Sequence, residues 1–149
     1  MEPRLAEILV RGGVVSREQL DEATNIQKQN GSTNLVQELV RLGHTTEDQL
    51  TDFLSRQFGI EKADLANAEL PDSVFNIVPV QLIQKYQLIP LKFLGSTLTI
   101  AMSDPTNLGA ISEVKFTTGY GVKVVLAPGS AIKKVLDDRF GTVTYDEVL

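Results

Sequence analysis

The first 57 residues contain the same pattern twice, and this duplication constrains the fold more than any other feature of the chain. When residues 4–27 are aligned with residues 34–57, eight of the 24 positions are identical. Unrelated segments of ordinary composition would share roughly one or two. A regular internal repeat of this kind indicates duplicated architecture. The identical pairs are Leu5/Leu35, Leu9/Leu39, Val10/Val40, Arg11/Arg41, Gly13/Gly43, Gln19/Gln49, Leu20/Leu50 and Gln27/Gln57.

Each copy of the repeat has the pattern of a helical hairpin. Apolar residues at helical spacing precede Gly13 and Gly43, and a second amphipathic stretch follows each glycine. Glycine is expected there because it adopts the left-handed conformation that ends many helices. Ser16-Arg-Glu-Gln19 and Thr46-Glu-Asp-Gln49 are typical capping boxes at the start of the longer helix. The repeat is therefore predicted to form about four helices.

The last residue of each copy is a glutamine at a position where an apolar side chain would be expected. Gln27 lies seven residues after Leu20, and Gln57 lies seven residues after Leu50, so both amides are predicted on the apolar side of a helix. A polar group there needs a partner. One interpretation is that each amide bonds a nearby backbone carbonyl and fixes the packing of the hairpins. The other is that two related hairpins present two amides to one ligand with two equivalent halves.

The repeated motif resembles a known family. The pattern Arg4-Leu5-x-x-x-Leu9-Val10-x-x-Gly13-x-Val15-x-x-x-Gln19-Leu20-x-x-Ala23-x-x-x-Gln27 is similar to the N-terminal domain of the GspE/PilB-type ATPases of type II secretion and type IV pilus assembly. The segments Ala101-Met-Ser-Asp104-Pro-Thr-Asn107 and Phe116-Thr-Thr-Gly119-Tyr120 extend the resemblance, which covers about residues 4–140. In that family, the tandem motif is characteristic of the MshEN-type module, which binds cyclic di-GMP, a two-fold symmetric dinucleotide.

The resemblance implies a set of ligand contacts, drawn from both copies and one later turn. It also shows departures from the family motif, which begins Arg-Leu-Gly. Ala6 and Val36 stand where the family has glycine, and Asn34 replaces the second arginine; an amide only partly replaces the planar donor fork of a guanidinium. The second half-site is therefore expected to be weaker than the first. The implied contacts are Arg4, Leu5, Gln27, Asn34, Leu35, Gln57 and Asp104.

After about residue 60 the pattern changes from helical repeats to alternating helices and strands. Strands are predicted at residues 88–93, 97–102 and 122–126, with helices near 71–86, at 108–118 and from about 129 to 140. The predicted fold class is therefore α+β. The predicted organisation is a helical tandem-repeat subdomain at 1–59, a small α/β subdomain at 60–141 and a tail or linker at 142–149.

Several classes of function are disfavoured by the sequence. It contains no Gly-x-x-x-x-Gly-Lys-Ser/Thr loop, so the ATPase module of the full-length relatives is not expected here and the chain is predicted to be non-enzymatic. One histidine and no cysteine predict no metal site and no cofactor, and His44 is predicted to face solvent. A net charge of −5 argues against nucleic-acid partners and general attraction to anionic membranes. No segment is apolar enough to insert in a membrane, and a cytoplasmic location is expected.

Two functions remain open after these exclusions. The first is a regulatory domain of a type II secretion or type IV pilus system that binds cyclic di-GMP through the duplicated motif. The second is a docking module without a nucleotide ligand, which would couple an assembly ATPase to an inner-membrane platform protein of the GspL or PilM kind. The residues Arg4, Gln27 and Gln57 favour the first, whereas Ala6, Asn34 and Val36 favour the second.

Overall fold

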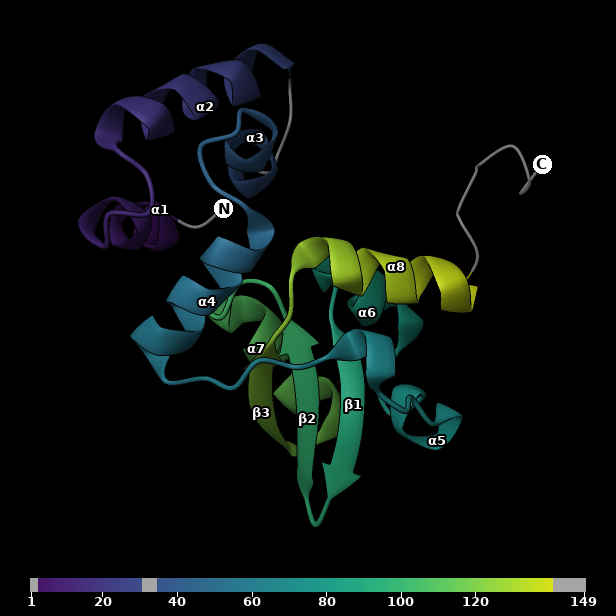
Figure 1. Ribbon diagram of the computed structural model, residues 1–149. Coiled ribbons are helices and arrows are strands. Elements are labelled where there is room, and N and C mark those ends of the chain that lie inside the picture. Colours follow the sequence, from purple (N-terminus) through teal and green to yellow (C-terminus); the bar gives the residue numbers. More distant parts are fainter. Residues whose placement is uncertain (1–2, 31–34, 141–149) are drawn as a thin grey trace, which may run out of the picture. The chain divides into compact units, whose positions relative to one another are not determined.

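The computed structural model describes residues 3–30 and 35–140, and the chain falls into two compact units (Figure 1). The units are Met1–Leu54 and Ser55–Leu149. This division lies inside a helix, whereas the sequence pattern predicts a boundary after residue 59. The predicted tail at 142–149 lies outside the described residues. With helices in both units and a sheet in the second, the fold is α+β, as predicted.

Four helices form the tandem repeat, as the duplicated pattern predicts. The first copy contains α1 (Pro3–Arg11) and α2 (Arg17–Asn30), and the second contains α3 (Leu35–Arg41) and α4 (Glu47–Phe58). Only the part of α4 up to Leu54 belongs to the first unit. Within that unit α2 packs against both α1 and α3. Each copy is therefore a short helix and a longer helix joined by a tight turn.

The turn of each hairpin is a left-handed glycine closed by two backbone hydrogen bonds. Gly13 has φ of 77° and donates to the carbonyl of Val10 at 3.1 Å, while Val14 donates to the carbonyl of Leu9 at 3.0 Å. This pair of bonds is the Schellman arrangement, which satisfies carbonyls that the end of a helix leaves free. The second copy repeats it 30 residues later, with φ of 79° at Gly43 and bonds of 3.0 and 3.1 Å.

Both predicted capping boxes are confirmed. Ser16 N–H donates to Gln19 Oε1 at 2.9 Å, and Gln19 N–H donates to Ser16 Oγ at 3.1 Å. The second copy makes the same reciprocal pair between Thr46 and Gln49, at 3.2 and 3.1 Å. Four backbone donors that the starts of two helices would leave free are satisfied in this way. The two copies are thus alike in local structure as well as in sequence.

The packing between the copies is less symmetric than their turns. A Cβ atom added to Gly12 would lie 2.3 Å from the ring of Phe53, so this glycine makes room for an aromatic side chain of the other copy. In the repeat alignment, Gly12 corresponds to Leu42 and Phe53 corresponds to Ala23. One copy therefore carries the two small residues and the other carries the two large ones. The buried apolar residues of this unit are Leu5, Leu9, Val15, Leu20, Ala23, Leu39, Leu50 and Leu54.

The second unit is a three-stranded sheet with helices, and its elements agree closely with the sequence prediction. Strand β2 (Thr97–Met102) and helix α7 (Leu108–Thr118) occupy the predicted residues. The remaining elements are η1 (Leu65–Asn67), α5 (Asp72–Phe75), α6 (Val80–Tyr86), β1 (Ile89–Leu94), β3 (Gly121–Leu126) and α8 (Gly129–Phe140). Proline residues 71 and 79 precede α5 and α6, where a missing N–H does not weaken the helix.

The sheet has the order β1-β2-β3, with an antiparallel and a parallel pair. A two-residue turn joins β1 to β2, and α7 carries the chain back so that β3 lies parallel to β2. Because β2 is central, its residues from Leu98 to Met102 are buried on both faces. The backbone of Leu126 also bonds Glu61 and Ala63, which fixes the segment after α4 to the end of β3.

The core of the second unit joins the sheet to the helices that cover it. Ala110 and Val114 of α7 and Ile132 and Leu136 of α8 belong to the same buried cluster as the central residues of β2. A polar contact links α6 to α7, since Tyr86 Oη donates to Glu113 Oε1 at 2.6 Å. A side-chain hydrogen bond with Tyr86 raises the pKa of Lys85, and the charge of Glu113 acts in the same direction.

We predict that Gly12→Ala destabilises the chain through its contact with Phe53. Gly12 does not have a left-handed φ, so alanine fits the backbone and the effect comes from overpacking, on the order of 1 kcal/mol. The free energy of unfolding, measured by urea denaturation, should therefore fall for Gly12→Ala and recover when Phe53→Leu is added. Equal losses with and without Phe53→Leu would contradict this packing.

Candidate functional site

The two repeated glutamines differ in their surroundings. Gln27, near the end of α2, is half-buried, whereas Gln57 is exposed. The prediction that both amides lie on a buried side is therefore wrong for Gln57, because α4 ends one residue later and residues 56–59 are all exposed. In the part of the chain that the structure describes, neither amide makes a hydrogen bond. The interpretation in which each amide bonds a backbone carbonyl finds no support among these residues.

The other predicted contacts are distributed over several environments. Leu5 is only 1% exposed and belongs to the core of the first unit. Asp104 lies in the turn before α7 and is half-buried. Its Oδ1 atom accepts from the backbone N–H of Thr106 at 2.9 Å and from Thr106 Oγ1 at 2.5 Å. This carboxylate therefore shapes the start of α7, as aspartate commonly does in turns.

Part of the predicted site lies outside the described residues. Asn34 and the side chains of Arg4 and Leu35 belong to this part. Of the remaining contacts, Leu5 and Gln27 belong to the first unit, and Gln57 and Asp104 belong to the second. Within the first unit, Leu5 lies near the start of α1 and Gln27 near the end of α2, so both residues belong to the first hairpin.

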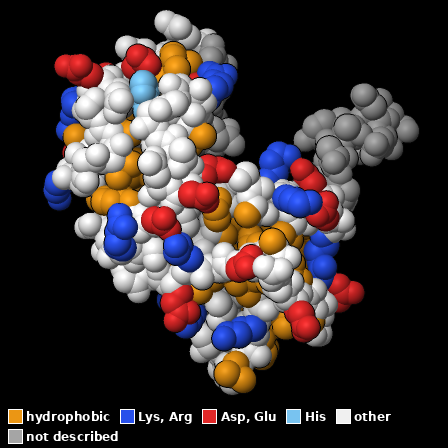
Figure 2. Space-filling view, viewed as in Figure 1, with side chains coloured by type: hydrophobic (Ala, Val, Ile, Leu, Met, Phe, Trp, Pro, Cys, Tyr) orange, Lys and Arg blue, Asp and Glu red, His pale blue; other side chains and the backbone are white. Residues whose placement is uncertain are grey.

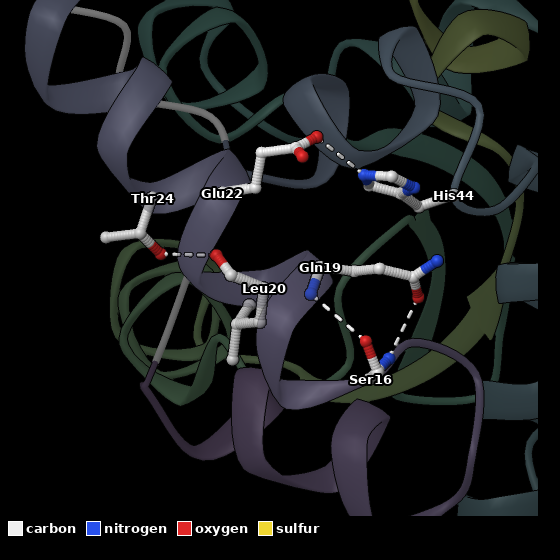
Figure 3. Close-up of polar contacts among 6 residues, drawn as sticks. All are labelled: Ser16, Gln19, Leu20, Glu22, Thr24 and His44. Atoms are coloured by element: carbon white, nitrogen blue, oxygen red, sulfur yellow. Dashed lines mark hydrogen bonds and ion pairs between the residues drawn. The ribbon is translucent and has the colours of Figure 1, made fainter.

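A polar contact between the two copies was missed by the sequence prediction. His44 Nε2 lies 2.9 Å from Glu22 Oε1, and the histidine side chain is only 19% exposed (Figure 3). The prediction that His44 faces solvent is therefore wrong. His44 aligns with the apolar, half-buried Val14, and this correspondence was the available signal. The contact joins the turn after α3 to the middle of α2, which is the helix that carries Gln27.

A buried carboxylate is a second feature that the sequence prediction missed. Glu38 is only 5% exposed, although it aligns with the apolar Ile8 of the first copy. Its Oε2 atom accepts a hydrogen bond from Arg41 Nη2, and the arginine side chain is 62% exposed. A buried carboxylate requires such a partner. Arg41 is therefore paired with a carboxylate of its own helix, α3. The side chain of the corresponding Arg11 is 80% exposed, and its Nη2 atom lies 3.9 Å from Glu7 Oε2.

Among residues 3–30 and 35–140, no three His, Cys, Asp or Glu side chains are grouped in a way that could hold a metal ion. In the same part of the chain, none of the helices has the length and apolar character needed to cross a lipid bilayer.

A protein-family model matches much of the chain. The MshEN domain model matches residues 58–144, which is more than half of the sequence. The matched residues begin at the last residue of α4, so the match covers most of the second unit and leaves the tandem repeat outside it. The family match is thus carried by the α/β unit, whereas the resemblance described from the sequence began with the repeat.

Curated relatives extend the similarity over most of the chain. The type IV pilus assembly ATPase PilB of Myxococcus xanthus is 35% identical over 92% of this chain. PilB of Pseudomonas aeruginosa is 29% identical over 84% of the chain. The chain spans only about a quarter of the length of these relatives, 24% and 23% respectively.

Solved structures share the fold over most of the chain. The structure of MshE with cdg, cyclic di-GMP, has a TM-score of 0.72 and 33% sequence identity, and the superposition covers 92% of this chain and 99% of that chain. The N-terminal domain of XpsE has a TM-score of 0.70 at 20% identity, covering 92% and 97%. The likeness to XpsE concerns the fold alone. The family match and the similarity to PilB of Myxococcus xanthus show that the chain belongs to the MshEN domain family, whose curated relatives here are type IV pilus assembly ATPases.

Proposed function

We propose that this chain is a regulatory domain of an assembly ATPase and that it binds cyclic di-GMP through its duplicated hairpins. The observation that carries the proposal is the duplication itself: two hairpins have the same left-handed glycine turn and the same capping box, and each ends its motif with a glutamine. Two similar half-sites suit a ligand with two equivalent halves. The fold similarity to MshE with cdg supports the same ligand.

The chemistry of the half-sites also suits a guanine dinucleotide. Glutamine offers both a donor and an acceptor, and arginine offers a planar donor fork that fits guanine edges and phosphates. Gln27 makes no hydrogen bond to any described residue, so its amide is available to a ligand. Leu5 acts by fixing α1, since its side chain is buried in the core. Asp104 and Gln57 are proposed contacts of the second unit.

The second half-site is proposed to be the weaker one. Asn34 cannot supply a guanidinium, and Val36 has a branched side chain where the family motif has glycine. Binding would then depend mainly on the first copy. A ligand held by one strong and one weak half-site is bound less tightly than one held by two strong ones, because the contacts of the two halves contribute together.

We predict that Gln27→Ala weakens cyclic di-GMP binding at least about tenfold, which corresponds to ~1.4 kcal/mol. The wild-type chain is expected to bind with a dissociation constant of roughly micromolar or below in isothermal titration calorimetry. Arg4→Ala should have a similar or larger effect, because charged hydrogen bonds are the stronger ones. GTP and ATP serve as ligand controls and should give no comparable heat.

Gln29→Ala is the matched control for this experiment. Gln29 lies on the same helix two residues later and is exposed, so its truncation tests any general effect on α2. Its affinity should equal that of the wild type. If Gln27→Ala and Gln29→Ala bind equally well, the first half-site has been assigned to the wrong residues. If the wild-type chain itself does not bind, the cyclic di-GMP proposal fails.

We predict that restoring the family motif in the second copy strengthens binding. The double substitution Asn34→Arg and Val36→Gly adds a guanidinium and removes a branched side chain, so the dissociation constant should fall at least about fivefold, or ~1 kcal/mol. Asn30→Arg adds the same charge at a neighbouring position and is the control for general attraction. An unchanged affinity in the double variant would refute the diagnosis of a weakened half-site.

The alternative is a docking module that binds no nucleotide and couples the ATPase to a platform protein of the GspL or PilM kind. It is favoured by Ala6, Asn34 and Val36, which depart from the family motif. Under this alternative the hairpins serve as a scaffold. The calorimetric titration separates the two functions, because a docking module without a ligand site gives no heat with cyclic di-GMP and no shift of its unfolding midpoint.

A further inference from the structure

One end of the sheet in the second unit brings three elements together. Because β2 and β3 are parallel and α7 connects them, the end of α7 and the start of β3 lie at the same end of the sheet as the β1–β2 turn. Gly121 N–H donates to the carbonyl of Ser96 at 2.9 Å, and the ring centroids of Phe93 and Tyr120 are 4.5 Å apart. These contacts join the turns into one surface.

Large apolar side chains are exposed at this end of the sheet. Phe116, in the last turn of α7, is 90% exposed, and Leu94, beside the hairpin turn, is 76% exposed. Tyr120 is 38% exposed despite its contact with Phe93. In Figure 2 a hydrophobic side chain forms the lowest tip of the molecule, with a basic side chain immediately above it. Exposed apolar groups beside charged ones are typical of interaction surfaces.

Three exposed lysines lie on the same elements as these apolar residues, namely β1, β3 and the end of α7. Lys92, Thr99 and Lys123 are register partners on neighbouring strands, so both lysines lie on one face of the sheet, and Leu94 lies on that face two residues along. Lys115 precedes Phe116 at the end of α7, and all three lysines are exposed. No carboxylate among the described residues forms an ion pair with them, whereas Lys133 and Lys134 of α8 are paired with Asp137 and Asp138.

The charge of the chain is unevenly distributed. Residues 87–103 and 114–128 contain three lysines and no Asp, Glu or Arg, in a protein with a net charge of −5. The overall charge argues against attraction to an anionic surface, but this end of the second unit has the opposite sign. Local charge decides such contacts, because exposed charges act over about one Debye length, roughly 10 Å at 0.1 M salt.

We propose that this end of the second unit docks onto the surface of an anionic lipid bilayer. The distal surface is defined by Lys92, Leu94, Lys115, Phe116, Tyr120 and Lys123. Lysines near a bilayer are attracted to anionic headgroups, apolar side chains enter the boundary of the acyl chains, and tyrosine suits the interface. The surface would contact the membrane from one side and would not cross it.

Two observations favour lipid over an acidic protein partner. Leu94 lies next to a projecting two-residue turn and Phe116 is almost fully exposed, so both side chains can enter the boundary of the acyl chains without any rearrangement of the fold. The basic residues are all lysines, which are depleted in protein interfaces, whereas arginine is enriched there. Headgroup attraction requires charge but no bidentate geometry, and lysine supplies it.

The absence of tryptophan from the chain allows a direct test. Phe116→Trp places the chain's single tryptophan on the distal surface, where its emission can be excited separately from that of tyrosine, and Phe58→Trp is an aromatic control in the last turn of α4. The probes are vesicles of phosphatidylcholine alone or with phosphatidylglycerol. We expect a blue shift of the Phe116→Trp emission with phosphatidylglycerol vesicles only, reversed by high salt, and no shift for Phe58→Trp.

The contribution of the lysines is tested by co-sedimentation with the same vesicles. Changing Lys92, Lys115 and Lys123 to Gln should lower the partition coefficient by at least about tenfold, because each lysine contributes roughly fivefold near an anionic surface. Changing Lys85, Lys133 and Lys134 to Gln removes the same total charge from other positions and should leave binding within about twofold. Circular dichroism confirms that both triple variants are folded.

Three results would overturn the proposal. They are equal losses in the two triple variants, equal binding to vesicles with and without phosphatidylglycerol, and no binding of the wild-type chain at low salt. The last result would indicate that the partner of the distal surface is an acidic protein segment and not a lipid bilayer. All of these measurements are made without cyclic di-GMP, so they are independent of the function proposed for the repeat.

Discussion

Gly13 and Gly43 take the same left-handed conformation, and the course of each helical hairpin is set there. Two backbone hydrogen bonds close each turn, and a capping box then begins the longer helix three residues later. These bonds join residues close in sequence, so the turn and the helix start of each hairpin are determined within its own copy of the motif. The duplicated sequence therefore becomes a duplicated structure, on which the proposed two-part ligand site depends.

The two copies are similar in their turns and different in their packing. Gly12 of the first copy makes room for Phe53 of the second. In the repeat alignment, Gly12 corresponds to the larger Leu42, and Phe53 corresponds to the smaller Ala23. His44 of the second copy contacts Glu22 of the first, whereas the residue equivalent to His44 in the first copy is the apolar Val14. The two copies therefore contact each other through residues that differ in size or polarity between equivalent positions. They are consistent with a ligand site in which one half is stronger than the other.

Local signals made most of the fold predictable from the sequence. The capping boxes, the left-handed glycines, and the positions of β2 and α7 depend on neighbouring residues and were predicted correctly. The burial of His44 and Glu38 and the exposure of Gln57 depend on contacts distant in sequence or on where a helix ends, so periodicity alone missed them. Of the candidate site, the sequence indicates which residues to test, and the structure describes Leu5, Gln27, Gln57 and Asp104.

The most direct test of the central claim is a two-dimensional NMR titration of the labelled chain with cyclic di-GMP. The side-chain amide resonances of glutamine report each proposed contact separately. If the duplicated hairpins form the site, the Gln27 side-chain amide should shift and saturate together with backbone amides near Leu5, and the Gln29 amide should not move. Saturable shifts confined to residues far from Gln27, or no shifts at millimolar ligand, would contradict the account.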